Sequence, residues 1–248
     1  MTQSNESIQQ FFTDYYSDHD TSEGFQRWRA LLAESNADKI VPLIERCGQP
    51  FASVVELGCG DGALLAELSE RTIGESYVAY EVSSSAVEYV RSRAIDGLRA
   101  VKVYDGSRTP EPDRSFDLAI VSHVIEHAND PVGVLREAGR LAPTVAVQII
   151  LADTLPARRS AHRNEVKRTG HINEYNLARA RAAIHSAGLE VIADLVTHPD
   201  RTLRTYWDRS ARAQALALLA SNSFKLAPAL ARRLFATDYT AISVGGAV

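Results

Sequence analysis

One stretch of the chain reads Val54-Val55-Glu56-Leu57-Gly58-Cys59-Gly60-Asp61-Gly62. Its two leading β-branched residues are typical of a buried parallel strand, and three glycines follow within five positions. Residues 63–68 then have the pattern of a helix. A strand, a glycine-rich turn and a helix form a cradle for a nucleotide, because glycine lets the backbone approach a ligand that a Cβ atom would push away.

The glycine pattern alone is ambiguous, since residues 58–63 also match the G-x-G-x-x-G/A pattern of dinucleotide-binding turns. Glu56, two residues before the first glycine, separates the two interpretations. Its carboxylate would repel a pyrophosphate, and it would hold a cationic ligand that carries an amino group. With Glu56, the stretch resembles the first motif of the class I S-adenosylmethionine (SAM)-dependent methyltransferases, (V/L)(L/D)(E/D)xGxGxG.

This resemblance spans roughly residues 54–189 and implies a doubly wound α/β fold, with a seven-stranded sheet whose last strand is antiparallel. Glu56 would hold the methionine amino group. Glu81 lies about twenty residues beyond the glycine turn, the spacing at which an acidic side chain accepts hydrogen bonds from ribose hydroxyls. Asp105 either contacts the adenine amino group, as the resemblance implies, or only forms a turn. The expected cofactor-binding residues are Glu56, Gly58, Cys59, Gly60, Gly62, Glu81, Val82, Asp105, Gly106 and His123.

The composition limits which cellular compartment and which binding partners we expect. The 248 residues suffice for one domain with additions, and the net charge of −4 gives no large basic field for nucleic acid. Five basic residues lie within residues 158–168, and such a cluster is at least as typical of a solvated loop as of a nucleic-acid-binding patch. Cys59 lies within the glycine turn and Cys47 is the other cysteine, so we expect no disulfide and a reducing cytoplasm. The sequence contains neither the apolar core of a signal peptide nor an apolar run of about 18 residues, so we expect no contact with a membrane.

Residues 1–50 are expected to form a helical lid. At helical spacing, one aromatic face is made by Ile8, Phe11, Phe12, Tyr15 and Tyr16. That face either packs on the domain or covers the site, and the candidates for substrate contact are Tyr15, Tyr16 and His19. A second helix is expected around residues 25–32. A third is expected over about residues 36–46, with Pro42 near its first turns or at a kink.

Strands and helices then alternate through a SAM-binding core at residues 51–197. The fourth strand, residues 116–121, is nearly all apolar, as a central strand covered on both faces should be. Residues 198–235 are expected to be an inserted helical pair, which either caps the substrate or forms a homodimer interface. The segment 236–248 supplies the last strand of the core.

The histidines carry the expected chemistry. The sulfonium methyl is already activated, so positioning supplies much of the rate, and the remaining task is often removal of the acceptor's proton by a base or with a metal. His123, Glu126 and His127 share one face if their segment is helical, and they follow the fourth strand, where open α/β sheets bind ligands. His171 comes from the long loop of residues 152–172. The catalytic candidates are His123, His127 and His171.

Three interpretations of this cluster stay open: a metal site, His171 as a metal-free general base or substrate contact, and a purely structural role. As metal ligands, His123, Glu126, His127 and His171 would suit a divalent transition metal. The set resembles the small-RNA 2′-O-methyltransferases and the ubiquinone-pathway O-methyltransferases, which carry E-x-x-E-H after the fourth strand; His123 replaces the first glutamate, which favours a softer metal than magnesium. In small-molecule methyltransferases without metal, an E-H pair is also common there, with the histidine corresponding to His127 in a structural role.

The predicted function is methyl transfer from SAM to a small organic acceptor such as a secondary metabolite, at oxygen, nitrogen or carbon. A 2′-O-methyltransferase of an RNA 3′ end and a catalytically silent SAM-binding subunit are the alternatives. A nicotinamide dehydrogenase is disfavoured by Glu56 and by the antiparallel last strand expected here.

Overall fold

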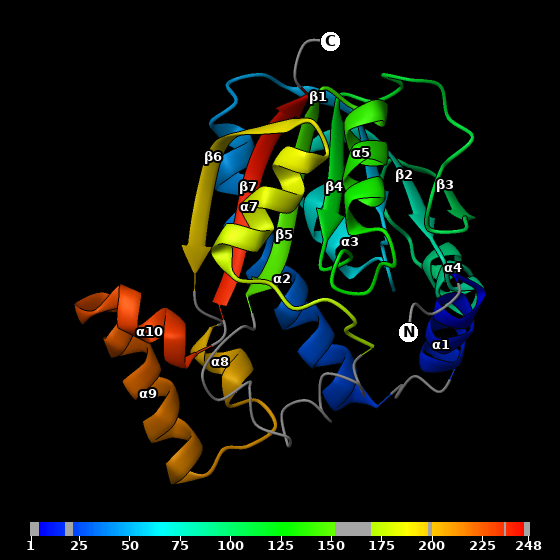
Figure 1. Ribbon diagram of the computed structural model, residues 1–248. Helices are drawn as coiled ribbons and strands as arrows, with labels where there is room; N and C mark the ends of the chain where they lie inside the picture. Colours follow the sequence, from blue (N-terminus) through cyan, green and yellow to red (C-terminus); the bar gives the residue numbers. More distant parts are fainter. Residues whose placement is uncertain (1–4, 18–21, 152–169, 198–199, 236, 246–248) are drawn as a thin grey trace.

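The computed structural model describes residues 5–17, 22–151, 170–197, 200–235 and 237–245 (Figure 1). Seven strands form one sheet in the order β3-β2-β1-β4-β5-β7-β6. The strands are β1 Phe51–Leu57, β2 Gly74–Glu81, β3 Leu98–Val103, β4 Leu118–Ser122, β5 Thr144–Leu151, β6 Leu189–Thr197 and β7 Thr237–Gly245. β1 to β5 pair in parallel, whereas β7 runs antiparallel to both β5 and β6. The α/β class, the strand number and the antiparallel last strand predicted from the sequence are confirmed.

Helices cover both faces of the sheet and bury one hydrophobic cluster on each (Figure 1). On one face lie α2 Glu23–Glu45, α3 Ala63–Glu70 and α4 Ser84–Ser92. On the other lie α5 Pro131–Leu141 and α7 Leu177–Ser186. The central strand β4 is buried on both faces, which explains its nearly continuous apolar sequence.

The helix α2 corrects the sequence prediction of two separate helices before β1. It begins after the cap Ser22, whose side chain accepts from the amide of Phe25, and it runs unbroken for 23 residues. The segment between residues 32 and 36 contains no glycine or proline, so nothing there ends the helix. Pro42 lies within the last turn of α2, where the missing N–H costs at most one bond of an otherwise continuous ladder.

The remaining helices gather at the edge of the sheet where the parallel strands end (Figure 1). They are α1 Asn5–Ser17 and the three helices between β6 and β7, namely α8 Arg201–Arg204, α9 Ala211–Leu226 and α10 Pro228–Leu234. Within the described ranges, no helix has both the length and the apolar character needed to cross a membrane. Of these helices, α1 and α8 contribute residues to the cavity that holds the candidate site residues, whereas no described residue of α9 or α10 lines it.

Candidate active site

A cavity of about 970 Å³ opens at the carboxyl ends of the parallel strands. It lies over β1 and β4, which are neighbours in the sheet although β2 and β3 come between them in the chain. This is the switch point at which open α/β sheets bind their ligands. The predicted residues that line it are Tyr15, Tyr16, Glu56, Gly58, Cys59, Gly60, Glu81, Val82, Asp105, Gly106, His123, His127 and His171.

The glycine turn forms the floor of this cavity. The amides of Gly58 and Cys59 both donate to the carbonyl of Tyr80, at 2.7 and 3.2 Å, which fixes the turn against β2. Gly60 has φ +54°, and a Cβ atom there would lie 2.5 Å from the hydroxyl of Tyr16. Gly62 caps α3 with φ +72° and lies against Val90, and it is not among the residues that line the cavity.

Glu56 lies buried under the turn, without a positively charged partner among the described residues. The residue is 2% exposed, and its Oε2 has no hydrogen-bond partner among the described residues. Burial, with the charges of Glu81 and Asp61, raises the pKa of Glu56 to about 8. A buried carboxyl without a counter-charge fits a ligand that brings an ammonium group to this side of the cavity.

Glu81 ends β2 and holds the turn from the other side. Its Oε2 accepts from the amide of Gly60 at 2.8 Å, and its Oε1 accepts from the amides of Val82 and Ser83 at 2.8 and 3.0 Å. Burial raises the pKa of Glu81 more than these amides lower it. The carboxylate is therefore fixed in position at the cavity wall, where it can accept hydrogen bonds from vicinal hydroxyls.

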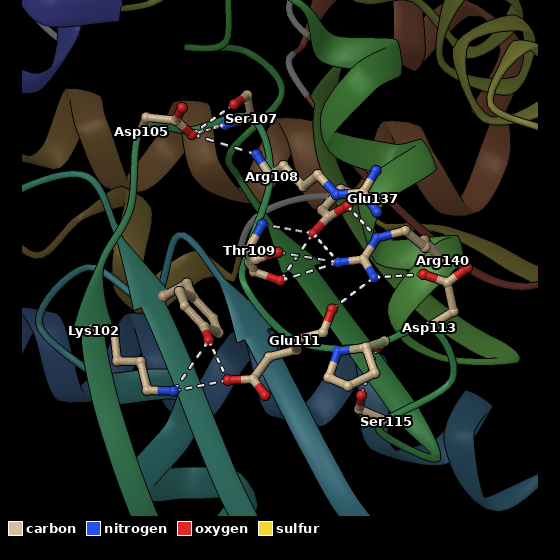
Figure 2. Close-up of polar contacts among 12 residues, drawn as sticks. Lys102, Asp105, Ser107, Arg108, Thr109, Glu111, Asp113, Ser115, Glu137 and Arg140 are labelled. Atoms are coloured by element: carbon tan, nitrogen blue, oxygen red, sulfur yellow. Dashed lines mark hydrogen bonds and ion pairs between the residues drawn. The ribbon is translucent and has the colours of Figure 1, made fainter.

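Asp105 follows β3 in a loop that a polar network pins to α5 (Figure 2). The Oδ1 of Asp105 accepts from the amide and hydroxyl of Ser107, at 2.9 and 2.6 Å. Further along the loop, the amide and hydroxyl of Thr109 donate to Glu137, and Arg140 bonds both Glu137 and the loop carbonyl of Glu111. The side chain of Asp105 is a turn former, as one interpretation of the sequence expected, and it also lines the cavity.

His123 begins the acceptor side of the cavity. It has φ +55°, a left-handed conformation that is uncommon for a residue with a side chain, and its amide donates to the carbonyl of Gln148 at 2.9 Å. Its Nδ1 lies 3.7 Å from Oε1 of Glu126 and has no hydrogen-bond partner among the described residues. Burial raises the pKa of Glu126, but the His123 imidazole and the Ile150 amide outweigh it, so the net shift is downward.

His127 and His171 lie side by side, with ring centroids 4.6 Å apart. Asn173 brings them together, because its side-chain amide donates to the carbonyls of Ile125 and Ala128, at 3.0 and 2.7 Å. Burial lowers the pKa of His127, whose ring also hydrogen-bonds the backbone of Gly170. His127 is therefore a neutral imidazole at physiological pH.

The four predicted metal ligands are not arranged to hold a metal ion. Residues 123–127 form a bend and a turn and not the helix that would place their side chains on one face. The Oε1 of Glu126 already accepts from the amide of Ile150 at 2.6 Å, and the His127 and His171 rings meet edge to face at 64°. Among the described residues, no group of three or more His, Cys, Asp or Glu side chains is arranged to hold a metal.

Two helices contact the glycine turn, through Tyr16, which the sequence analysis named, and through Arg29, which it missed. Arg29 of α2 forms an ion pair with Asp61 of the glycine turn, and Tyr16 of α1 lies above Gly60. The side chain of Asn5 donates to the carbonyl of Asp105, which ties the start of α1 across the cavity. Arg29 carried no sequence signal, since its partner lies 32 positions away. The lid candidate His19 falls outside the described residues.

This fold and site define a class I SAM-dependent methyltransferase. The sequence model of a methyltransferase domain family matches residues 18–194, more than two thirds of the chain, and the chain belongs to this family. No curated protein sequence matches it.

Several solved structures with a similar fold are described as methyltransferases. Geranyl diphosphate C-methyltransferase from Streptomyces coelicolor, in complex with Mg²⁺, geranyl diphosphate and S-adenosyl-L-homocysteine (SAH), is 14% identical with a TM-score of 0.67, over 97% of each chain. The Haloferax volcanii complex of a methyltransferase with the activator Trm112 gives 17% identity and a TM-score of 0.66, over 94% of this chain and 97% of that one. A Thermotoga maritima SAM-dependent methyltransferase, described as a possible histamine N-methyltransferase, gives 16% and 0.60, over 96% and 99%. At these sequence identities, the similarity shows a shared fold and says nothing of the substrate.

Proposed function

We propose that this enzyme transfers the methyl group of SAM to a small, largely apolar organic acceptor of the secondary-metabolite type, at oxygen, nitrogen or a nucleophilic carbon. The observation that carries this proposal is that one cavity holds both the glycine turn and the histidines. Its volume of about 970 Å³ is at the upper end for small-molecule sites. Such a cavity has room for a cofactor and a small acceptor beneath the same lid.

The cofactor half of the cavity suits SAM group by group. Glu56 would hold the methionine amino group, because its buried Oε2 lacks any other partner among the described residues. Glu81 would accept from the ribose hydroxyls and Asp105 from the adenine amino group. SAM supplies a methyl group on a sulfonium, and the protein supplies its orientation toward the acceptor.

On the acceptor side, we propose His123 as the general base when the acceptor must lose a proton. Its ring lines the cavity, and Glu126, 3.7 Å from the buried Nδ1, stabilises the imidazolium that forms, which assigns Nε2 as the proton acceptor. His127 instead supports the turn, since its ring packs against both Phe12 and His171. Because the histidine and glutamate donors do not converge on one point, we assign no step to a metal.

The test is methyl transfer from radiolabelled SAM into a fractionated cell extract. Label should enter the small-molecule fraction with wild-type protein, and His123→Ala should reduce it by about 10²–10⁴-fold for an acceptor that loses a proton. Glu88→Ala, an exposed change on α4, is the matched control. Label that enters RNA and falls steeply with salt would point instead to an RNA 2′-O-methyltransferase. SAM binding without transfer to any fraction would indicate a silent SAM-binding subunit.

A further inference from the structure

The cavity has a second end that the cofactor does not account for. Glu56 and Glu81 lie at the carboxyl ends of β1 and β2, and Asp105 follows β3, on one side of the switch point. β4, β5 and β7 lie on the other side, and the cavity continues over their ends. We call this part the distal end. It is lined by Trp28, Leu32, Lys39, Ile150, Thr237 and Asp238.

A buried ion pair lies in this otherwise largely apolar wall. The Nζ of Lys39, on α2, lies 2.7 Å from the Oδ2 of Asp238, the second residue of β7. The side chains are 9% and 10% exposed. Asp238 pairs in register with Ile150 of β5, so both charges are at the same sheet edge as His123. Burying two charges costs desolvation, which makes such a pair a weak way to join a helix to a strand.

The pair has hydrogen-bonding capacity beyond its own contact. An ammonium carries three donors, and among the described residues Lys39 donates one hydrogen bond, to Asp238. A carboxylate has about four acceptor positions, and Oδ2 of Asp238 uses one of them for Lys39. A ligand at the distal end therefore meets a donor and an acceptor side by side.

The charges select the kind of group that fits. An anionic group would be attracted by Lys39 but repelled by Asp238, and a cationic group would meet the reverse. An apolar group would remove water from both charges and replace none of its hydrogen bonds. A hydroxyl can accept from Lys39 and donate to Asp238 at once, and it leaves the pair neutral.

We propose that Lys39 and Asp238 form the recognition subsite for an uncharged hydroxyl group on an otherwise apolar acceptor. This subsite rests on the proposed function, because it is the acceptor half of the same cavity. Trp28, Leu32 and Ile150 would contact the apolar body. The hydroxyl recognised here orients the acceptor, and it need not be the atom that receives the methyl group.

The experiment compares three probes of similar size, naphthol, naphthalene and naphthoate, binding to protein saturated with SAH. Naphthol should bind at least about tenfold more tightly than naphthalene, since one recognised hydroxyl with charged partners is worth that much. Naphthoate should bind no more tightly than naphthalene. In the double variant Lys39→Met/Asp238→Leu, which leaves no single buried charge, the preference for naphthol should disappear while SAH affinity is unchanged.

A matched double variant, Arg91→Met/Glu88→Leu, removes an exposed ion pair on α4 and should keep the preference. Equal binding of naphthol and naphthalene to wild type, tighter binding of naphthoate, or no binding of any probe would overturn the subsite. A naphthol preference that survives in the folded Lys39/Asp238 variant would also overturn it. If that variant does not fold, the comparison of the three probes on wild-type protein tests the subsite by itself. Wild-type protein that fails to bind SAH would instead overturn the proposed function.

Discussion

Arg29 and Asp61 form a two-pronged ion pair, with Nε to Oδ2 at 2.9 Å and Nη2 to Oδ1 at 2.5 Å. The side chains are 17% and 3% exposed, so the pair is largely shielded from water. It joins the lid helix α2 to the glycine turn, and it places Tyr16 and Arg29 together above Gly60. The geometry of the glycine turn therefore depends on Arg29, which lies outside residues 51–197.

Arg29→Ala should lower the free energy of unfolding by about 3 kcal/mol, because it removes both hydrogen bonds of Arg29 to the buried Asp61 carboxylate and leaves only Arg93, at 3.9 Å, as a counter-charge among the described residues. Urea unfolding at neutral pH measures this. The control is Arg27→Ala, an exposed arginine on the same helix, for which a change within about 0.5 kcal/mol is expected. Equal losses in the two variants would show that the ion pair contributes little.

The same pair predicts a pH dependence. Burial raises the pKa of Asp61, but the hydrogen bonds and charge of Arg29 outweigh it, so the pKa lies below its ordinary 3.8. The unfolded chain therefore binds a proton before the folded one does as pH falls, and the stabilisation is lost through the folded pKa. The difference in unfolding free energy between wild type and Arg29→Ala should be largest at neutral pH and shrink as pH falls, because the buried Asp61 of the variant, without Arg29, takes up its proton at a higher pH than in wild type. A difference that stays constant under acid conditions would contradict this.

Glu56→Gln should stabilise the cofactor-free protein and weaken SAM binding. The pKa of Glu56 is raised from 4.5 to about 8, so stability falls as pH rises through this range, where the unfolded chain loses its proton first. The variant should gain up to about 3 kcal/mol at neutral pH and little below pH 4.5. SAM affinity should fall about tenfold or more, because a charged hydrogen bond is lost. Thermal unfolding and titration calorimetry measure the two effects; a loss of stability at neutral pH would refute the account of Glu56.

Gly60→Ala should disturb the lid as well as the turn. Its new Cβ atom would meet the Tyr16 hydroxyl at 2.5 Å, in addition to the strain of φ +54°. Gly48→Ala is the matched control, because Gly48 has φ +67° and nothing within 4 Å of a Cβ atom. Both variants should lose about 1 kcal/mol of stability to strain, and only Gly60→Ala should also lose SAH affinity. Tyr16→Phe in the Gly60→Ala background should recover part of that affinity, and unchanged affinity in Gly60→Ala would contradict the contact.

The parts of the site that the sequence predicted are those encoded locally. The glycine turn, Glu56 and Glu81 belong to a strand–turn–helix–strand unit whose spacing is set by strand and helix lengths. The fold class followed for the same reason, since each strand carries its own apolar pattern. The single helix α2 was missed: two helices were expected, around residues 25–32 and 36–46, with Pro42 near the first turns of the second or at a kink, although Pro42 lies in the last turn of α2.

The parts that could not be predicted depend on tertiary contacts. Lys39 and Asp238 lie 199 positions apart, and neither falls in a motif. The convergence of His127 and His171 was expected, but their orientation is set by Asn173 and by turns in place of a helix. The orientation of the two rings decides whether they can act as metal ligands, and it cannot be predicted from the spacing of residue types in the sequence.

The most direct test of the account is the binding of SAH to wild type, Glu81→Ala and Glu75→Ala by titration calorimetry. Glu81 lines the cavity, whereas Glu75 is an exposed glutamate on the same strand. The account predicts one SAH per wild-type chain, a loss of affinity of about tenfold or more in Glu81→Ala, and no change in Glu75→Ala. Unchanged affinity in a folded Glu81→Ala protein, or no SAH binding by wild type, would contradict it.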